Sequence, residues 1–206
     1  LDTVLKKKPE LLVDALGCTS VMEVLEQPEK FFNFMEESAK LFYIGKLQIA
    51  EIINKQSRRL TSREKKRIYE HPKAGTKVLE KIPSMQKYRD MILGHHKSWD
   101  GKMGYPKDFD NCASPDRMLI EILRISDCLD AATDFAQCLE EFSLGKGTLY
   151  CQELIELLEG DAALQDELTY LLEAGRIRTY YEVFWGMMEP CDEEQEKHLQ
   201  ERWKQT

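Results

Sequence analysis

Apolar residues recur at helical spacing along most of this 206-residue chain, and a convincing two-residue alternation of polar and apolar side chains is hard to find. Residues 9–16 read as a helix that stops at Gly17, and Pro28 opens another helix. Thr61 and Glu64 have the form of a capping box, in which the two side chains satisfy the unpaired backbone donors of a new helix. These signals predict an all-α fold.

Proline and glycine predict where the later helices begin and end. The expected helices cover about 62–70, Pro72 to about Lys81, and a segment after Pro83 that runs up to His95. Ser114-Pro115 resembles an N-cap followed by a first-turn proline, and it opens a long helix to about residue 141. Residues from about 150 to 206 read as three acidic amphipathic helices divided by Gly160, Gly175 and Pro190.

These elements predict one main domain with a C-terminal helical extension. N-terminal helices over 1–37 lead into a core over 38–141, and residues 142–206 form the extension. Apolar residues of the extension recur at helical spacing, namely Leu154, Leu157, Leu158, Leu168, Leu171 and Leu172. These side chains either pack against the main domain or form a homodimer interface.

Composition argues against several functional classes. A hydrophobic content of 42% is typical of a globular protein, and a formal net charge of −8 argues against a general nucleic-acid or anionic-membrane coat. No apolar run approaches the roughly 18 residues of a membrane span, no signal-like start is visible, and the expected location is the cytoplasm. The six cysteines include no Cys-x-x-Cys pair, so neither a zinc knuckle nor a redox dithiol is predicted.

A basic cluster interrupts this acidic chain. It consists of Arg58, Arg59, Arg63, Lys65, Lys66 and Arg67. The cluster steers an anionic nucleotide, contacts an acidic partner helix, or is simply a solvated helix start. The sequence leaves these three interpretations open.

The stretch from His95 to Pro106 is the richest in residues that carry chemistry. It reads His-His-Lys-Ser-Trp-Asp-Gly-Lys-Met-Gly-Tyr-Pro and holds two of the chain's four histidines. Adjacent imidazoles can bind a metal, while the glycines and the proline bend the backbone. A solvated loop does not need this combination.

Two further residues strengthen the metal hypothesis. Asp127 falls between Ile120 and Leu123 on the apolar face of its helix, where an ionised carboxylate needs a metal, lysine or histidine as partner. The alternative is a tilted helix from which Asp127 reaches solvent. His71 precedes Pro72 at a helix junction, where a side chain projects from a fixed bend. Three histidines and a buried acid suit zinc, iron, manganese or nickel better than calcium or magnesium.

These motifs resemble those of the HD-GYP family, helical metal-dependent phosphohydrolases best known as cyclic di-GMP phosphodiesterases. The similarity covers about residues 38–134 and is carried by several motifs in the right order. They are His71-Pro72 followed by Gly75, His95-His96 through Tyr105-Pro106, and Ser126-Asp127 through Thr133. The resemblance implies an HD-domain-like helical bundle.

The resemblance also implies a metal site and a substrate pocket. The implied metal ligands are His71, His95, His96 and Asp127. Lys46 is the implied contact to a substrate phosphate. The implied pocket wall against the nucleotide consists of Gly104, Tyr105 and Pro106. The expected cofactor is a divalent transition metal (Fe, Mn, Ni or Zn), which in such sites generates hydroxide and clamps phosphate oxygens, and the expected ligand is a cyclic dinucleotide.

The chain departs from the family pattern in the name-giving His-Asp pair. Gly45-Lys46 matches and fixes the alignment, but Phe42 stands where the family has a histidine ligand, and Tyr43 stands where it has the metal-bridging aspartate. Phe42 cannot coordinate a metal, and a tyrosine phenol with a pKa of about 10 is a poor bridge at neutral pH. Lys97 places a cation beside the proposed cluster, and Met103 lengthens the loop by one residue.

The histidine loop matches the family pattern while the His-Asp pair is missing, and this combination favours a degenerate HD-GYP-type domain. We expect it to be a regulatory, cyclic-dinucleotide-binding or partner-binding signalling module with lost or weak phosphodiesterase activity. The remaining ligands form either a closed mononuclear site, which lacks the open position that hydrolysis needs, or a metal-free pocket in which the histidines hydrogen-bond Asp127. One alternative is an active metal-dependent phosphohydrolase acting on cyclic di-GMP or another nucleotide. Another is a protein-interaction scaffold that presents the basic cluster or the C-terminal helices to a signalling partner.

Overall fold

The structure is a computed structural model that describes residues 1–49, 60–132 and 134–172. These residues form α-helices, short 3₁₀-helices and connecting loops, with two isolated β-bridges and no strand among them. The predicted all-α fold is therefore confirmed. Within the described ranges, no helix combines the length and the apolar character needed to cross a membrane.

The N-terminal part alternates α-helices with 3₁₀ turns, in the order α1 (Asp2–Lys7), η1 (Pro9–Leu12), η2 (Ala15–Gly17), α2 (Val21–Glu26) and α3 (Pro28–Leu41). The single helix predicted over 9–16 is wrong, because the backbone turns to a positive φ at Asp14 (79°) and Leu16 (53°). The Leu16 amide instead donates to Oδ1 of Asp116 at 2.8 Å. This tertiary contact is invisible to local sequence patterns.

The next elements carry most of the candidate site, and they are η3 (Ile44–Gln48), α5 (Ser62–Ile68), α6 (His71–Leu79), η4 (Pro83–Tyr88) and α7 (Arg89–Gly94). The predicted capping box at Thr61 is present and starts α5. η3 meets α6 at Gly45, where a Cβ atom would lie 1.9 Å from the His71 carbonyl oxygen. Only glycine permits this approach, so Gly45 fixes the segment after α3 against the start of α6.

The long helix predicted from Ser114 to about 141 is in fact two helices, α8 (Arg117–Ala131) and α9 (Phe135–Leu144), and η5 (Asn111–Ala113) precedes them. The break comes at Ala132, whose backbone is extended with φ −73° and ψ 148°. Asp134 then caps α9 by accepting a hydrogen bond from the Gln137 amide at 2.9 Å. The N-cap residue is present in the sequence, but the apolar periodicity runs across it and hides it.

Two of the predicted C-terminal helices lie within the described residues, as α10 (Gln152–Gly160) and α11 (Ala162–Tyr170). Gly160 ends α10, and Asp161 caps α11 by accepting a hydrogen bond from the Leu164 amide at 3.2 Å. The breaks expected at Gly175 and Pro190, and the third helix, lie outside the described residues.

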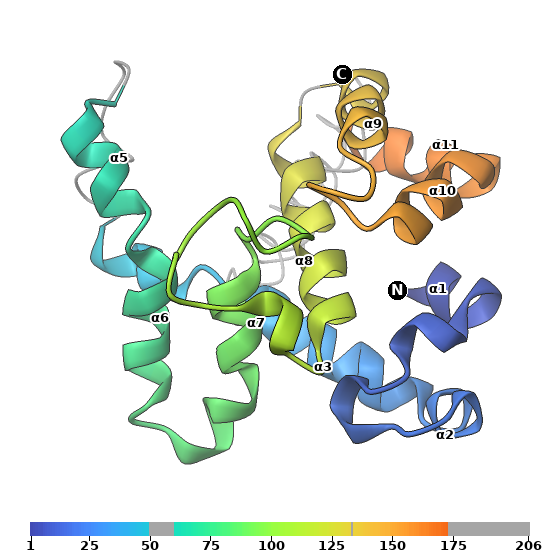
Figure 1. Cartoon of the computed structure of the whole chain (residues 1–206), viewed down its shortest axis with the longest axis horizontal. Coiled ribbons are helices and arrows are strands. Elements are labelled where there is room, and N and C mark those ends of the chain that lie inside the picture. The colour runs from blue at the N-terminus through green and yellow to red at the C-terminus, as the bar shows by residue number, and fades with distance from the viewer. Residues whose placement is uncertain (50–59, 133, 173–206) are drawn as a thin grey trace, which may run out of the picture.

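Two hydrophobic cores hold the helices together. The main core lies among α1, α2, α3, α6, α7 and α8, and it includes Phe31, Ile92 and Ile120. A second core joins α9, α10 and α11 to the end of α8 through Leu129 and Phe142. Figure 1 shows α8 between α7 on one side and α9, α10 and α11 on the other. α8 therefore connects the bundle with the C-terminal extension.

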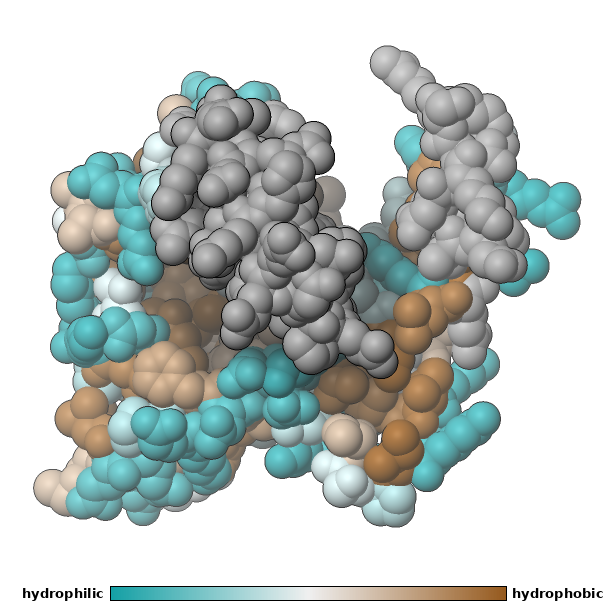
Figure 2. All heavy atoms as spheres, turned by 180° about the vertical axis from the view of Figure 1, so that it is seen from behind, coloured by the Kyte–Doolittle hydropathy of each residue, from teal (hydrophilic) through white to brown (hydrophobic). Residues whose placement is uncertain are grey.

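The leucines of the extension pack against both cores. Leu154 belongs to the main core and Leu157 packs against it, whereas Leu158, Leu168 and Leu172 contact the second core. The predicted packing against the main domain is confirmed for Leu154 and Leu157, whereas Leu171 is 43% exposed. The homodimer interface stays a prediction. Figure 2 shows the molecule from behind, with hydrophilic residues along its lower edge and hydrophobic residues gathered towards the middle of this face.

Candidate metal centre

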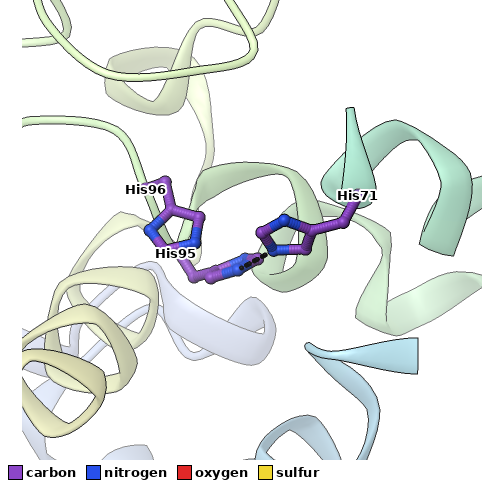
Figure 3. Close-up of side chains that lie close together, drawn as sticks. All are labelled: His71, His95 and His96. Atoms are coloured by element: carbon purple, nitrogen blue, oxygen red, sulfur yellow. Dashed lines mark hydrogen bonds between the residues drawn. The ribbon is translucent and has the colours of Figure 1, made fainter. Parts of the chain in front are cut away.

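Three histidines come together where α6 begins and α7 ends. His71 is the first residue of α6, His95 caps the end of α7, and His96 is next in the chain. One ligand atom of each histidine lies within 4.8 Å of the other two, and Figure 3 shows the three side chains beside one another. His71 and His95 are completely buried. The fold thus gathers the three histidines that the sequence singled out.

The facing nitrogens of His71 and His95 require a cation or a proton between them. Nδ1 of His71 lies 2.7 Å from the Ile68 carbonyl oxygen, and Nδ1 of His95 lies 2.8 Å from the Ile92 carbonyl oxygen. A carbonyl oxygen only accepts, so both Nδ1 atoms carry the proton and both Nε2 atoms of the neutral rings present lone pairs. These Nε2 atoms lie 2.9 Å apart, where two lone pairs repel each other.

Burial argues against a proton as the bridging species at neutral pH. Desolvation lowers the pKa of His71 to about 4 and that of His96 to about 3. Desolvation also holds the pKa of His95 well below its usual range, and the neighbouring histidines add to this effect. The charge of Lys46 lowers all three pKa values further. The rings are therefore neutral, which is the form that binds a metal ion.

His96 supplies a third nitrogen in need of a partner. Its Nε2 atom is buried without a hydrogen-bond partner among the described residues, and an unsatisfied polar atom of this kind costs about 1–3 kcal/mol. Nitrogens 2.9 Å apart, as in His71 and His95, can both lie at the roughly 2.0–2.1 Å typical of a zinc–nitrogen bond. The Nδ1–H to carbonyl bonds are also what metal-binding histidines usually make on their far side. The donor set therefore fits a divalent transition metal.

Asp127, the fourth predicted ligand, is engaged elsewhere. The Tyr43 hydroxyl donates a short hydrogen bond to Oδ1 of Asp127, and Oδ2 lies 3.8 Å from Nδ1 of His96. Burial and the Asp127 charge raise the pKa of Tyr43, so the phenol keeps its proton and remains a donor. The partner expected for this acid was a metal, a lysine or a histidine; the structure gives one oxygen the Tyr43 hydroxyl as donor and places a histidine, His96, near the other. The group of side chains that could hold a metal ion consists of the three histidines, and Asp127 is not part of it.

Phe42 and Lys46 lie on the same side of the site as Tyr43. The Phe42 ring stacks on Tyr43 with the ring centroids 3.9 Å apart, and it meets the His95 ring edge-on at 5.2 Å. Nζ of Lys46 lies 3.2 Å from the centroid of the Tyr43 ring, which is a cation–π contact. Burial lowers the pKa of Lys46, and Asp127 partly offsets this effect. The predicted phosphate contact is thus beside the histidines.

The Gly-Tyr-Pro segment lies against His96. Gly104 has a φ of +88°, and a Cβ atom there would lie 1.9 Å from the His96 carbonyl oxygen, so the position requires glycine. The Tyr105 ring centroid lies 4.6 Å from that of His96 and 4.5 Å from that of Tyr69, and Pro106 is buried. Tyr69 belongs to no motif in the sequence, and only the fold brings it to Tyr105.

Lys97 follows His96 directly in the chain, and its effect on the cluster stays a prediction. Its side chain is buried, and its charge contributes, after that of Lys73, to the lowered pKa of Asp108. The cations that lower the pKa of His96 are Lys46 and Arg124.

Comparison with known proteins identifies the family of this bundle. A family model described as HD domain matches residues 6–135, which is more than half of the chain. The chain belongs to the HD domain family. A cyclic di-GMP phosphodiesterase of Thermotoga maritima is 26% identical over 147 residues, and the aligned region covers 66% of this chain and 39% of that relative. This chain therefore spans well under half the length of that relative.

The matched segment of this HD domain ends at Phe135, the first residue of α9. All three histidines and Asp127 lie inside the match, as do Phe42 and Tyr43. The likeness to HD-GYP proteins is thereby confirmed. α10 and α11 lie beyond the segment that the family model matches.

Proposed function

We propose that this HD domain is a signalling module that holds one divalent transition metal on His71, His95 and His96 and binds a cyclic dinucleotide with lost or weak phosphodiesterase activity. The observation that carries the proposal is the hydrogen bond from Tyr43 to Asp127, which engages the carboxylate that a second metal would need. The cyclic di-GMP phosphodiesterase of Thermotoga maritima supports the choice of ligand.

The chemistry of the candidate metal centre supports binding of a cyclic dinucleotide more than its hydrolysis. Two-metal hydrolysis of a phosphodiester stabilises both the attacking and the leaving oxygen. Phe42 offers no donor atom to a second metal, and Tyr43 keeps its proton. A divalent ion on three neutral ligands, with the Lys46 ammonium beside it, retains its positive charge for an anionic phosphate.

A metal-dependent phosphohydrolase is the second candidate function. The open coordination position left by the Tyr43–Asp127 hydrogen bond favours it. Catalytic zinc sites typically combine three protein ligands with one water, and the metal lowers the pKa of that water to about 7. On this alternative, the water on a single metal would hydrolyse the nucleotide.

An interaction scaffold is the third candidate, and α5 favours it. None of the residues of α5 is buried, and the helix stands apart from the bundle in Figure 1. Four members of the basic cluster lie on α5, namely Arg63, Lys65, Lys66 and Arg67. Arg58 and Arg59 lie outside the described residues. This surface would suit an acidic signalling partner.

Titration with product analysis separates the three candidates. Metal-free protein is loaded with Mn²⁺, Fe²⁺, Ni²⁺ or Zn²⁺ and titrated with cyclic di-GMP, while chromatography follows the linear product. We expect saturable binding with little product, and loss of that binding in His95→Ala. Met103→Ala is the matched control, because Met103 belongs to the same loop and is 62% exposed.

The double variant Phe42→His/Tyr43→Asp tests the reason given for weak hydrolysis. It restores two donor side chains and releases Asp127, so we expect it to bind a second metal and to form product faster than the wild type. Rapid product formation by the wild type would overturn the proposal in favour of the phosphohydrolase. Neither binding nor product would overturn it in favour of the scaffold.

A further inference from the structure

The carbonyl of Leu149, in the turn over 145–151 between α9 and α10, is an acceptor shared by two parts of the molecule. It accepts a hydrogen bond from the Trp99 amide at 2.9 Å and another from Nη1 of Arg124 at 2.5 Å. The Asp100 amide adds a parallel contact to the Thr148 carbonyl at 2.9 Å. The turn is thus tied both to the histidine loop and to α8.

These contacts are close to the metal centre along the chain. Trp99 follows His96 by three residues, and Arg124 precedes Asp127 by three residues, about one turn of α8. A movement of the turn at Leu149 therefore moves the backbone beside His96. The extension contacts the histidine loop through the carbonyls of Thr148 and Leu149.

Glu121 and Arg124 hold the turn from the α8 side. Their side chains are 2% and 12% exposed, and Nη1 of Arg124 lies 3.4 Å from Oε1 of Glu121. The same carboxylate accepts a hydrogen bond from the Cys151 amide at 3.0 Å, and the Arg124 guanidinium lies 4.4 Å from the centroid of the Tyr150 ring. Buried ion pairs contribute little net stability, so this arrangement is better explained by the geometry that it imposes.

Arg117 clamps the loop from the other end of α8. Nη2 of Arg117 donates to the Trp99 carbonyl oxygen at 2.5 Å, and the guanidinium lies 3.6 Å from the centroid of the Trp99 ring. Trp99 is therefore held through its carbonyl by α8 and through its amide by Leu149. The loop that begins at His95 has few ways to move independently of the turn.

We infer that Glu121 and Arg124 are positioning residues for the histidine cluster, because they fix the turn over 145–151 and the turn fixes the backbone beside His96. The C-terminal extension, beyond the segment matched by the HD family model, then helps to set the affinity of the cluster for a metal. The inference rests on the proposed metal site and concerns no nucleotide.

The loss of the Arg124 charge and the loss of its contacts should change cation affinity in opposite directions. Arg124 carries a positive charge, which disfavours a nearby cation, so the loss of that charge alone would strengthen the binding of a cation. The loss of its positioning contacts would weaken that binding. Arg124→Met removes both the charge and the donors, and Arg124→Lys keeps the charge but loses the planar fork.

The experiment measures Co²⁺ affinity by chelator competition and the visible spectrum of bound Co²⁺, which reports ligand geometry. We expect Arg124→Met to bind Co²⁺ about 10-fold or more weakly, with a changed spectrum, and Arg124→Lys to be intermediate. Arg89→Met is the control, because Arg89 makes an exposed ion pair with Asp90. In metal-free protein, hydrogen exchange at Trp99 and Asp100 should accelerate in Arg124→Met. A second measurement does not require that variant to fold. Because coupling between two sites is reciprocal, Co²⁺ binding should slow hydrogen exchange of the Cys151 amide in the wild type.

The outcomes are distinguishable. Equal or tighter Co²⁺ binding by Arg124→Met, with an unchanged spectrum, overturns the inference and leaves the proposed function intact. Unchanged exchange at Cys151 in the wild type upon Co²⁺ binding overturns the inference in the same way. A wild type that binds no Co²⁺ overturns the proposed metal site and the inference with it.

Discussion

The Tyr43 hydroxyl donates a hydrogen bond to Oδ1 of Asp127, and this contact joins the segment after α3 to α8 beside the candidate metal centre. The Asp127 side chain is only 11% exposed, so its carboxylate needs a partner. Tyr43 provides a neutral donor where a metal would provide a positive charge. Under the proposed function, the contact accounts for a site that keeps three histidines and lacks a second metal position.

Removal of the Tyr43 hydroxyl should have opposite effects on the metal-free and metal-bound protein. In Tyr43→Phe the Asp127 carboxylate loses its donor, so we expect the free energy of unfolding of metal-free protein to fall by about 1–3 kcal/mol. The released carboxylate can then approach a bound ion, so the affinity for Zn²⁺ should rise. Urea unfolding with a chelator and Zn²⁺ competition check the two effects. Tyr69→Phe, at a ring that is 45% exposed, is the control. Equal Zn²⁺ affinities of Tyr43→Phe and the wild type would contradict the account.

Metal binding should stabilise the fold through the histidine pair. A ligand at 100 times its dissociation constant that binds only folded protein adds about 2.7 kcal/mol. His71→Ala removes one of the Nε2 atoms that lie 2.9 Å apart, so most of this stabilisation should disappear. Thermal unfolding with and without Zn²⁺ measures the effect. Equal stabilisation of the variant and the wild type would place the metal elsewhere.

Substitution of two glycines with similar backbone conformations distinguishes the cost of backbone strain from damage to the metal site. Gly104→Ala and Gly17→Ala both place a side chain at positive φ (+88° and +77°), which costs about 1–2 kcal/mol. A Cβ atom at Gly104 would also lie 1.9 Å from the His96 carbonyl oxygen, whereas at Gly17 it meets nothing within 4 Å. We expect both variants to lose stability and only Gly104→Ala to lose Zn²⁺ affinity. Equal losses of affinity would contradict the role given to Gly104.

Glu121 should lower the free energy of unfolding of the metal-free protein in a pH-dependent way. Burial raises the pKa of Glu121 above its ordinary value of 4.5, while Arg124 and the Cys151 amide oppose the rise. Above pH 4.5 the folded state therefore binds more protons at this site than the unfolded state, and its stability falls as the pH rises through the folded pKa. Glu121→Gln keeps an acceptor for Cys151 but does not titrate.

Urea unfolding between pH 4 and pH 8 measures this effect as a difference. The free energy of unfolding of Glu121→Gln relative to the wild type should rise with pH. A difference that is constant, or that falls with pH, would contradict the assignment of a raised pKa to Glu121.

The histidine cluster was predictable because its signals are local. His95 and His96 lie in one distinctive loop, and His71 precedes a proline that fixes a helix start. Tyr43 and Asp127 are 84 residues apart, so their pairing depends on how α3 and α8 pack. The resemblance implied that tyrosine stands in place of an aspartate ligand, but not that this tyrosine would engage the remaining acid.

The parts of the fold that escaped prediction depend on contacts with distant groups. The break between α8 and α9 and the turns over 9–17 run against local periodicity. The connection at Leu149 is a backbone carbonyl, which every residue possesses, so no side-chain pattern marks it. Arg124 and Glu121 looked like ordinary charged residues of a helix. Only their burial shows that they hold the turn.

Calorimetric titration of the metal-loaded chain with cyclic di-GMP tests the central claim most directly, because one trace reports both binding and turnover. The account predicts a saturable heat of binding that returns to baseline after each injection. A heat that continues after each injection, accompanied by linear product, would contradict the claim that the Tyr43–Asp127 contact has replaced efficient hydrolysis. A trace without any binding heat would contradict the assignment of the ligand.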